Sequence, residues 1–186
     1  MHAILRHLPN TLTGARFLAA PAIAYLLLHR IFDWALVTFL LAGLSDAVDG
    51  YLAKWLAPGS RVGVYLDPAA DKLLMLVAFV ALTKLGVSPL WLTVVVIARD
   101  AAIVAGIALA RSLALPVHVA PLPIGKASTA IQVGYVGLML FLLAFNLDAE
   151  RLRMTAVLAT AILTLASSLA YAQVLLKAFS LGRRTA

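Results

Sequence analysis

The chain has 186 residues, of which 63% are hydrophobic and only 12% are charged, whereas soluble domains are roughly 45–50% apolar and about 25% charged. This composition excludes a soluble globular domain and predicts an integral membrane protein. The net charge of +7 does not indicate a nucleic-acid-binding protein, because the basic residues form no run and no patch interleaved with aromatic residues. The chain contains no cysteine, which excludes disulfides and thiolate metal sites.

Apolar runs long enough to cross a bilayer, about 20 residues each, follow one another along the chain. Pro, Gly and charged residues separate six of them, which we expect at 12–29, 34–54, 63–85, 89–111, 127–146 and 152–177. The preceding segment MHAILRHLPN is too short to span and predicts a helix lying in the membrane interface. The expected fold is a single all-α integral membrane domain, residues 1–186, with six transmembrane helices and a short N-terminal interfacial helix.

Lys and Arg are unevenly distributed between the two ends of these spans. One set of connections contains Arg30, Lys84 and Arg151 together with three acidic residues. The other side receives both termini and the remaining loops, with basic residues at Arg6, Lys54, Arg61, Arg111, Lys126, Lys177, Arg183 and Arg184. Because cytoplasmic loops carry the excess of Lys and Arg, we expect both termini in the cytoplasm.

Four of the eight acidic residues gather around the connection between the second and third spans. Asp46 and Asp49 are three residues apart, and Asp67 and Asp71 are four apart, so each pair shares one helix face. Four bare carboxylates brought together there would repel one another and cost about 2.5–3.5 kcal/mol each at the bilayer centre. Divalent cations remove this cost. An all-oxygen site suits Mg²⁺, Mn²⁺ or Ca²⁺, and four carboxylates suffice for two ions roughly 3.5–4 Å apart.

Two other interpretations of the carboxylates are open: capping and ion pairing at two helix ends, or a divalent-cation carrier. Carriers often contain paired repeats and helices broken by Gly or Pro near the midplane, and this sequence shows neither. Small residues between the carboxylates, Gly50, Ala53 and Gly63, leave room for a helix or a nucleotide to approach.

The residues around this connection follow the pattern Asp46-x2-Asp49-Gly50-x2-Ala53-Lys54-x8-Gly63-x3-Asp67-x3-Asp71. The pattern resembles the signature of the CDP-alcohol phosphotransferase family, with Lys54 in the place of the family's arginine. The resemblance implies six transmembrane helices around a polar cavity open to the cytoplasm, two Mg²⁺ or Mn²⁺ ions, and displacement of CMP from a CDP-linked donor. Lysine lacks arginine's bidentate fork, so we expect Lys54 to weaken or reshape nucleotide binding.

The resemblance also implies roles for single residues. Asp46, Asp49 and Asp67 would be metal ligands, and Asp71 would be a metal ligand and the general base on the acceptor hydroxyl. The nucleotide would be bound by Asp49, Gly50, Ala53, Lys54 and Gly63.

The resemblance extends over nearly the whole chain. The segments Leu8–Pro21 (LPNTLTGARFLAAP), Ile97–Arg111 (IARDAAIVAGIALAR) and Pro123–Gln132 (PIGKASTAIQ) look like those of phosphatidylglycerophosphate synthases and cardiolipin synthases. Both use CDP-diacylglycerol, so the resemblance implies this donor, a bacterial-type inner or cell membrane and a homodimer. The acceptor would be glycerol 3-phosphate or phosphatidylglycerol. The Arg99-Asp100 pair resembles cardiolipin synthases more, and the segment GKASTAIQ resembles phosphatidylglycerophosphate synthases more.

The fourth span contains a second charged position. Arg99 and Asp100 stand in its middle, where a charge indicates a functional site. Because neighbours point about 100° apart on a helix, we do not expect these two to be each other's partner. We expect Arg99, Arg111 and Lys126, with Arg16, to bind the acceptor phosphate, which favours glycerol 3-phosphate over phosphatidylglycerol.

Each of these assignments has an alternative. Arg99 would instead pair with an aspartate of another helix, and Arg111 and Lys126 would be ordinary positive flanks of their spans. Arg16 would only extend to the interface. For Thr129 and Gln132 we favour interhelical hydrogen bonds over contact with a substrate.

Overall fold

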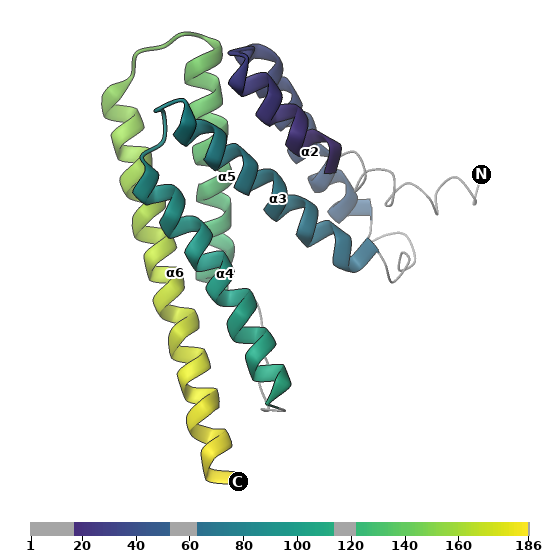
Figure 1. Cartoon of the computed structure of the whole chain (residues 1–186), viewed down its shortest axis with the longest axis vertical. Coiled ribbons are helices and arrows are strands. Elements are labelled where there is room, and N and C mark those ends of the chain that lie inside the picture. Colours follow the sequence, from purple (N-terminus) through teal and green to yellow (C-terminus); the bar gives the residue numbers. More distant parts are fainter. Residues whose placement is uncertain (1–16, 53–62, 114–121, 186) are drawn as a thin grey trace, which may run out of the picture. The chain divides into compact units, whose positions relative to one another are not determined.

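The computed structural model describes residues 17–52, 63–113 and 122–185, with side chains for 17–45, 70–110, 112–113, 122–177 and 180. In these ranges the chain is helical apart from short turns, as the composition predicts. The helices are Phe17–Leu28, α2 (Phe32–Leu52), α3 (Gly63–Lys84), α4 (Leu90–Ser112), α5 (Pro123–Ala144) and α6 (Glu150–Thr185) (Figure 1). The expected interfacial helix and the start of the first expected span lie outside the described residues.

Three of the described helices are long and apolar enough to cross a membrane: α4 over Leu90–Ala110, α5 over its whole length, and α6 over Glu150–Lys177. Two shorter apolar helices, Phe17–Leu28 and Phe32–Ser45, precede them. In α3, charged residues interrupt the apolar run in the first half of the helix. The helices therefore support a membrane protein, and the number of six spans stays a prediction.

Among the described helices, the start of α5 and the end of α6 differ most from the expected boundaries. α5 begins at Pro123 and not at 127, because proline suits the first helical position, where its missing N–H is not needed. α6 continues to Thr185 and does not end at 177. The apolar span does end at Lys177, but no proline follows to stop the helix. The end of an apolar run is therefore not the end of this helix.

The described helices form two compact units. Unit 1, Met1–Ser88 with Val136–Asp148, contains the helix Phe17–Leu28, α2, α3 and the second part of α5. Its interior consists of small and apolar side chains at helical spacing: Ala20, Ile23, Leu27, Ala35, Phe39, Ala70, Leu74, Ala78, Met139 and Leu140.

Unit 2, Pro89–Tyr135 with Ala149–Ala186, contains α4, the first part of α5, and α6. Within it, α4 and α6 pack along each other (Figure 1). Its interior is partly polar, with buried side chains at Thr93, Arg99, Ser128, Gln132, Thr160, Thr164 and Ser167. Buried polar groups need partners, so this interior is where the contacts of unit 2 are most specific.

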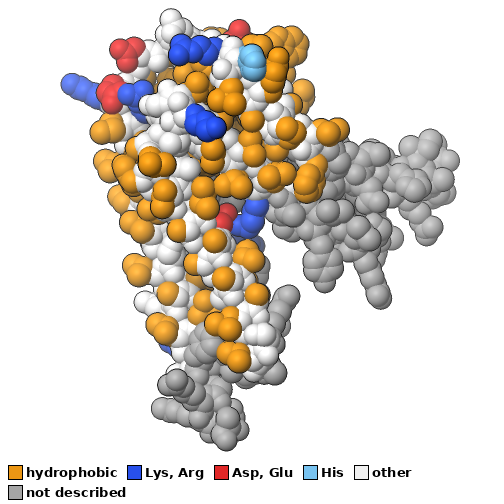
Figure 2. Space-filling model, viewed as in Figure 1, with side chains coloured by type: hydrophobic (Ala, Val, Ile, Leu, Met, Phe, Trp, Pro, Cys, Tyr) orange, Lys and Arg blue, Asp and Glu red, His pale blue; other side chains and the backbone are white. Residues whose placement is uncertain are grey.

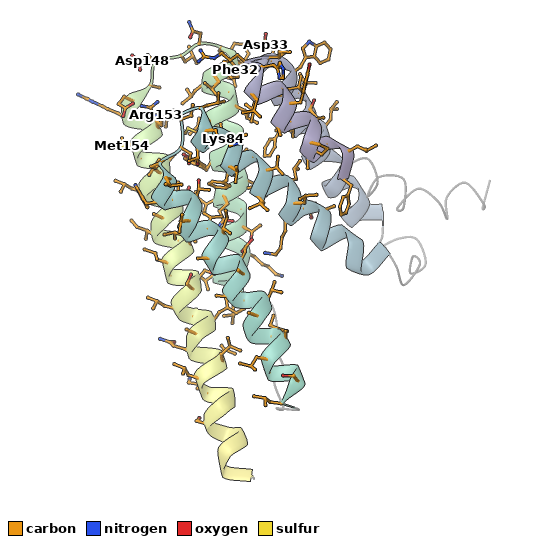
Figure 3. All side chains as sticks on the ribbon, in the orientation of Figure 1. Phe32, Asp33, Lys84, Asp148, Arg153 and Met154 are labelled. Carbon is orange, nitrogen blue, oxygen red and sulfur yellow. The ribbon has the colours of Figure 1, made fainter. Side chains whose placement is uncertain are left out.

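Several charged side chains lie at the ends of helices. Asp33 is in the first turn of α2, Lys84 in the last turn of α3, and Arg153 near the start of α6 (Figure 3). Apolar side chains cover much of the face drawn in Figure 2. The exposed apolar side chains of α6 include Leu158, Ile162, Leu165 and Leu169. Apolar flanks with charges at the ends are the pattern that lipid surroundings require.

Three helices end with the same backbone turn, in which one residue has a positive φ: Arg30 (60°), Gly86 (72°) and Asn146 (49°). After α3, the N–H of Gly86 donates to the Thr83 carbonyl and the N–H of Val87 to the Leu82 carbonyl, both at 3.0 Å. This is the Schellman arrangement, which satisfies the last carbonyls of a helix with backbone alone.

We expect Gly86→Ala to lower the free energy of unfolding by about 1 kcal/mol, because a side chain at this positive φ is strained. Gly134→Ala is the matched control, since Gly134 lies inside α5 and a Cβ there would meet no described atom within 4 Å. That change should stabilise the protein by roughly 0.5–1 kcal/mol. Thermal unfolding in detergent measures both, and shifts of the same sign would contradict the assigned turn.

Candidate active site

The two carboxylate pairs lie on the helices where the sequence predicts them. Asp46 and Asp49 are in the last two turns of α2, and Asp67 and Asp71 are in the first half of α3. All four belong to unit 1. Each pair keeps the spacing that puts both residues on one face of its helix, and only residues 53–62 separate the two helices.

Asp71 is the member of the cluster whose side chain the structure describes. It is half-buried, and it shares its helix face with Leu74 and Ala78, which are buried. This face of α3 is therefore buried from Asp71 onward, and Asp67 precedes Asp71 by one helical turn. Other site residues predicted from the sequence lie outside the described side chains: Asp46, Asp49, Gly50, Ala53, Lys54, Gly63 and Asp67.

The chemistry at Asp71 fits a hard divalent cation. Carboxylate oxygens are typical ligands of Mg²⁺ and Mn²⁺, and the Asp71 carboxylate is half-buried. The described side chains contain no group of three or more His, Asp or Glu that would hold a metal, and Asp71 is the one expected ligand among them. The binuclear site therefore stays a prediction.

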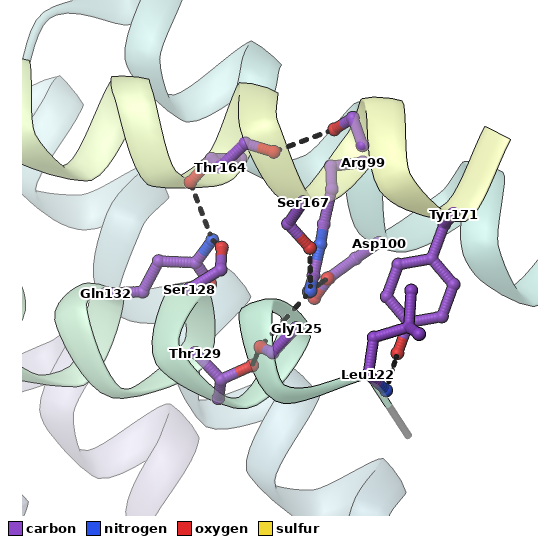
Figure 4. A network of polar contacts seen from close by, with 11 residues as sticks. Arg99, Asp100, Leu122, Gly125, Ser128, Thr129, Gln132, Thr164, Ser167 and Tyr171 are labelled. Carbon is purple, nitrogen blue, oxygen red and sulfur yellow. Dashed lines mark hydrogen bonds and ion pairs between the residues drawn. The ribbon is translucent and has the colours of Figure 1, made fainter. Parts of the chain in front are cut away.

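The principal polar network of unit 2 surrounds Arg99, whose side chain is only 5% exposed (Figure 4). Its Nη1 donates to Asp100 Oδ1 at 2.6 Å, and its Nη2 donates to Ser167 Oγ at 2.8 Å and to the Gly125 carbonyl at 3.4 Å. The guanidinium carbon lies 5.9 Å from the centre of the Tyr171 ring. Its Nε finds no hydrogen-bond partner among the described residues. One cation thus links α4, α5 and α6.

Arg99 and Asp100 do pair with each other, so the expectation that they would not is wrong. Neighbouring side chains leave a helix about 100° apart, but the arginine side chain is long enough to reach the adjacent carboxylate. Its interhelical partners are a hydroxyl and a backbone carbonyl, and no aspartate of another helix is among its described contacts.

Tyr171 of α6 contacts the beginning of α5. Its hydroxyl accepts a hydrogen bond from the Leu122 N–H at 3.3 Å. A Cβ on Gly125 would lie 2.8 Å from this hydroxyl oxygen and 2.9 Å from the ring carbon Cε2. Glycine at this position is therefore what allows the ring to approach α5.

Neither Tyr171 nor Ser167 was predicted from the sequence, although a signal was present. Four polar residues of α6, Thr160, Thr164, Ser167 and Tyr171, lie on one helix face. Spacings of three and four residues in an otherwise apolar span indicate a face turned toward another helix.

Gln132 makes a second link between helices. Its Nε2 donates to Thr164 Oγ1 of α6 at 3.0 Å and to Ser128 Oγ of its own helix at 3.4 Å. The interhelical interpretation is thus confirmed for Gln132. It is wrong for Thr129 among the described contacts, because the Thr129 hydroxyl donates to the Gly125 carbonyl of α5 itself, at 3.2 Å.

The structure describes the other three basic residues predicted to bind the acceptor phosphate, Lys126, Arg111 and Arg16, to different extents. Lys126 is exposed at the beginning of α5, directly after Gly125. Arg111 is near the end of α4, but its side chain is not described, and Arg16 lies outside the described residues. Arg99 thus contacts the first turn of α5, and Lys126 directly follows that turn in the chain. A phosphate pocket formed by Arg16, Arg99, Arg111 and Lys126 stays a prediction.

We expect Gly125→Ala to destabilise the protein by about 1–3 kcal/mol, the usual cost of overpacking, because the rigid Tyr171 ring must move away. Gly106→Ala is the comparison. A Cβ there would overlap only the end of the Leu175 side chain, which escapes by changing rotamer, so the cost should be smaller. Thermal unfolding in detergent distinguishes them, and an equal loss in both variants would contradict the close packing of Tyr171 on α5.

Known proteins match the chain over most of its length. A family model described as CDP-alcohol phosphatidyltransferase matches residues 6–174. Human cardiolipin synthase (CMP-forming) is 34% identical over 155 residues, which cover 75% of this chain and 52% of that protein. Cardiolipin synthase (CMP-forming) of Streptomyces coelicolor is 38% identical over 132 residues, 66% of this chain and 59% of the relative.

A relative with a different name matches a shorter region. CDP-diacylglycerol–glycerol-3-phosphate 3-phosphatidyltransferase of Cereibacter sphaeroides is 46% identical over 90 residues, 46% of this chain and 40% of that protein. The chain spans about half the length of the relatives it matches.

Proposed function

The chain belongs to the CDP-alcohol phosphatidyltransferase family, and on this premise we propose that it is a membrane enzyme. It would move a phosphatidyl group from CDP-diacylglycerol to an alcohol and release CMP. The observation that carries the proposal is the position of the two carboxylate pairs, at the end of α2 and in the first half of α3, around one short connection. A divalent-cation carrier has no use for the rest of the signature, including Gly63 four residues before Asp67.

Asp71 is the proposed general base. Its half-buried carboxylate lies on the same face of α3 as the buried Leu74 and Ala78, and there it would accept the proton of an acceptor hydroxyl within hydrogen-bond reach. The hydroxyl oxygen then forms a bond to the phosphatidyl phosphorus, and the bond from that phosphorus to the CMP oxygen breaks. The proton stays on Asp71 until it passes to solvent, and the electron pair of the broken bond leaves with CMP.

The proposed cofactor is Mg²⁺ or Mn²⁺, as two ions held by Asp46, Asp49, Asp67 and Asp71. When bound, such ions neutralise diphosphate charge and make CMP a better leaving group. The proposed nucleotide contacts are Asp49, Gly50, Ala53, Lys54 and Gly63. Lys54 contributes a single ammonium, so it attracts the diphosphate without fixing its orientation as an arginine fork would.

The proposed acceptor is glycerol 3-phosphate, with phosphatidylglycerol as the alternative. The Cereibacter relative carries glycerol 3-phosphate in its name and the human relative is named cardiolipin synthase, so the names support both. We assign the acceptor phosphate to Arg99, Arg111, Lys126 and Arg16, and the Arg99 Nε–H has no hydrogen-bond partner among the described residues. A phosphomonoester carries about −1.5 to −2 charges at pH 7 and a diester only one, so several cations favour the monoester.

The proposed orientation places both termini and the active site at the cytoplasmic face, because the excess of Lys and Arg lies on that side. A homodimer is proposed from the family resemblance.

We expect detergent-purified protein to release CMP from CDP-diacylglycerol when Mg²⁺ and glycerol 3-phosphate are present. Asp71→Asn should reduce the rate by about 10²–10⁴-fold, the usual contribution of a general base. Asp33→Asn is the matched control, because Asp33 is an exposed aspartate in the first turn of α2, and it should leave the rate unchanged. CMP release is measured chromatographically, with glycerol 3-phosphate and phosphatidylglycerol offered separately. No release with either acceptor under Mg²⁺ or Mn²⁺ refutes the proposal.

We expect Lys126→Gln to raise the KM for the acceptor by about tenfold or more, because a hydrogen bond to a charged group contributes roughly 1.5–3 kcal/mol. The KM for CDP-diacylglycerol should not change. Lys84→Gln, at an exposed lysine in the last turn of α3, controls for the loss of one positive charge. If both variants behave alike, Lys126 does not bind the acceptor.

A further inference from the structure

The first turn of α5, residues 122–125, is held at both ends by other helices of unit 2. The Leu122 N–H donates to the Tyr171 hydroxyl of α6 at 3.3 Å, and the Gly125 carbonyl accepts from Arg99 of α4 at 3.4 Å. A helix usually satisfies its first N–H groups with the side chain of its own N-cap residue, and leucine at position 122 offers no acceptor. The Tyr171 hydroxyl of a neighbouring helix satisfies one backbone donor at this helix start, the N–H of Leu122 itself.

Tyr171 makes three contacts with one ring. The hydroxyl binds Leu122, the ring lies 5.9 Å from the Arg99 guanidinium carbon, and the ring edge packs on Gly125. A tyrosine has only two side-chain torsions, so its hydroxyl holds the backbone more firmly than a long flexible side chain would. Arg99 is itself fixed by its neighbouring carboxylate and by a serine of α6.

Lys126 depends on this turn for its position. Its backbone N–H donates to the Leu122 carbonyl at 3.2 Å, and Leu122 is the residue that Tyr171 holds. The Lys126 side chain is exposed, and a lysine ammonium is a point charge on a flexible stem. Such a charge meets a phosphate in a defined place only when the backbone that carries it is fixed.

We propose that Tyr171, with Arg99 behind it, is a positioning residue that fixes the first turn of α5 and so presents the Lys126 ammonium to the acceptor phosphate. This inference rests on the proposed function, in which Lys126 binds the acceptor. Tyr171 touches no substrate, so its loss changes the use of the acceptor and leaves the use of the CDP-linked donor as it was.

A spin label tests the contact without reference to catalysis. Because the chain has no cysteine, Ala127→Cys introduces a single labelling site at an exposed position beside Lys126. We expect Tyr171→Phe, which removes only the hydroxyl, to increase the mobility of a nitroxide at position 127. A nitroxide attached through Val133→Cys, at an exposed position further along α5, should keep its mobility when Tyr171 is changed to Phe. Unchanged mobility at 127, or an equal increase at both positions, overturns the proposal.

Kinetics test the consequence. Tyr171→Phe should raise the KM for glycerol 3-phosphate about two- to tenfold, the range that one net hydrogen bond allows, and should leave kcat and the KM for CDP-diacylglycerol unchanged. Tyr25→Phe, at an exposed tyrosine of the first helix, is the matched control. In a Lys126→Gln background the effect of Tyr171→Phe should disappear. If the same increase persists there, Tyr171 acts on something other than Lys126 and the proposal is wrong.

The two measurements separate the possible failures. If the unsubstituted protein consumes neither glycerol 3-phosphate nor phosphatidylglycerol, the proposed function fails and the assignment to acceptor binding fails with it. The mobility at position 127 still decides whether Tyr171 holds the turn. If CMP is released normally and Tyr171→Phe leaves the KM for glycerol 3-phosphate unchanged, the proposed function stands, and only the positioning role of Tyr171 is refuted.

Discussion

Unit 2 is organised by the need to satisfy the Arg99 cation inside an apolar helix bundle. A charge in such surroundings is costly, and here the Asp100 carboxylate, the Ser167 hydroxyl and the Gly125 carbonyl offset that cost. These partners come from three helices, so the positions of all three are coupled to one side chain. Removing a partner would leave part of a buried charge uncompensated, which is more damaging than losing the pair as a whole. Gly125 therefore serves packing, because it has no side chain to displace Tyr171, and electrostatics, because its carbonyl accepts from Arg99.

The polar stripe of α6 fixes which side of that helix faces its neighbours. Apolar residues cannot do so, because lipid is as apolar as leucine and favours no particular face. Thr164 instead accepts a hydrogen bond from Gln132 of α5, and Ser167 accepts one from Arg99 of α4. With these residues turned inward, Leu158, Ile162, Leu165 and Leu169 are left exposed on α6. Hydrogen bonds thus determine the rotation of the helix, and apolar length determines only that it can span.

The sequence predicts helix boundaries well where charged residues flank an apolar run that is long enough to span a membrane. The expected 63–85 and 89–111 differ by at most one residue at each end from α3 (Gly63–Lys84) and α4 (Leu90–Ser112). It fails at the start of α5, which lies at Pro123 and not at 127. Proline suits a first helical position, and the glycine at 125 is explained only by the Tyr171 ring, which is distant in sequence. It also fails for Arg99 and Asp100, since side-chain direction at the Cα says little about where a long guanidinium ends. The sequence predicts that each carboxylate pair shares a helix face, because the i, i+3 and i, i+4 spacings are local. It does not predict the interhelical contacts of Arg99, because these join residues distant in sequence.

Positioning a polar group through the first turn of a helix suits a membrane protein for a physical reason. Irregular loops cannot be exposed to the hydrocarbon, because their backbone N–H and C=O groups find no water. Helix beginnings present the same problem, since their first N–H groups lack partners within the helix. At the start of α5, Pro123 has no N–H that needs a partner, and the Tyr171 hydroxyl accepts a hydrogen bond from the N–H of Leu122. The contacts that satisfy the backbone are thus the same contacts that fix Lys126, so stability and the placement of a charge are obtained from one set of interactions.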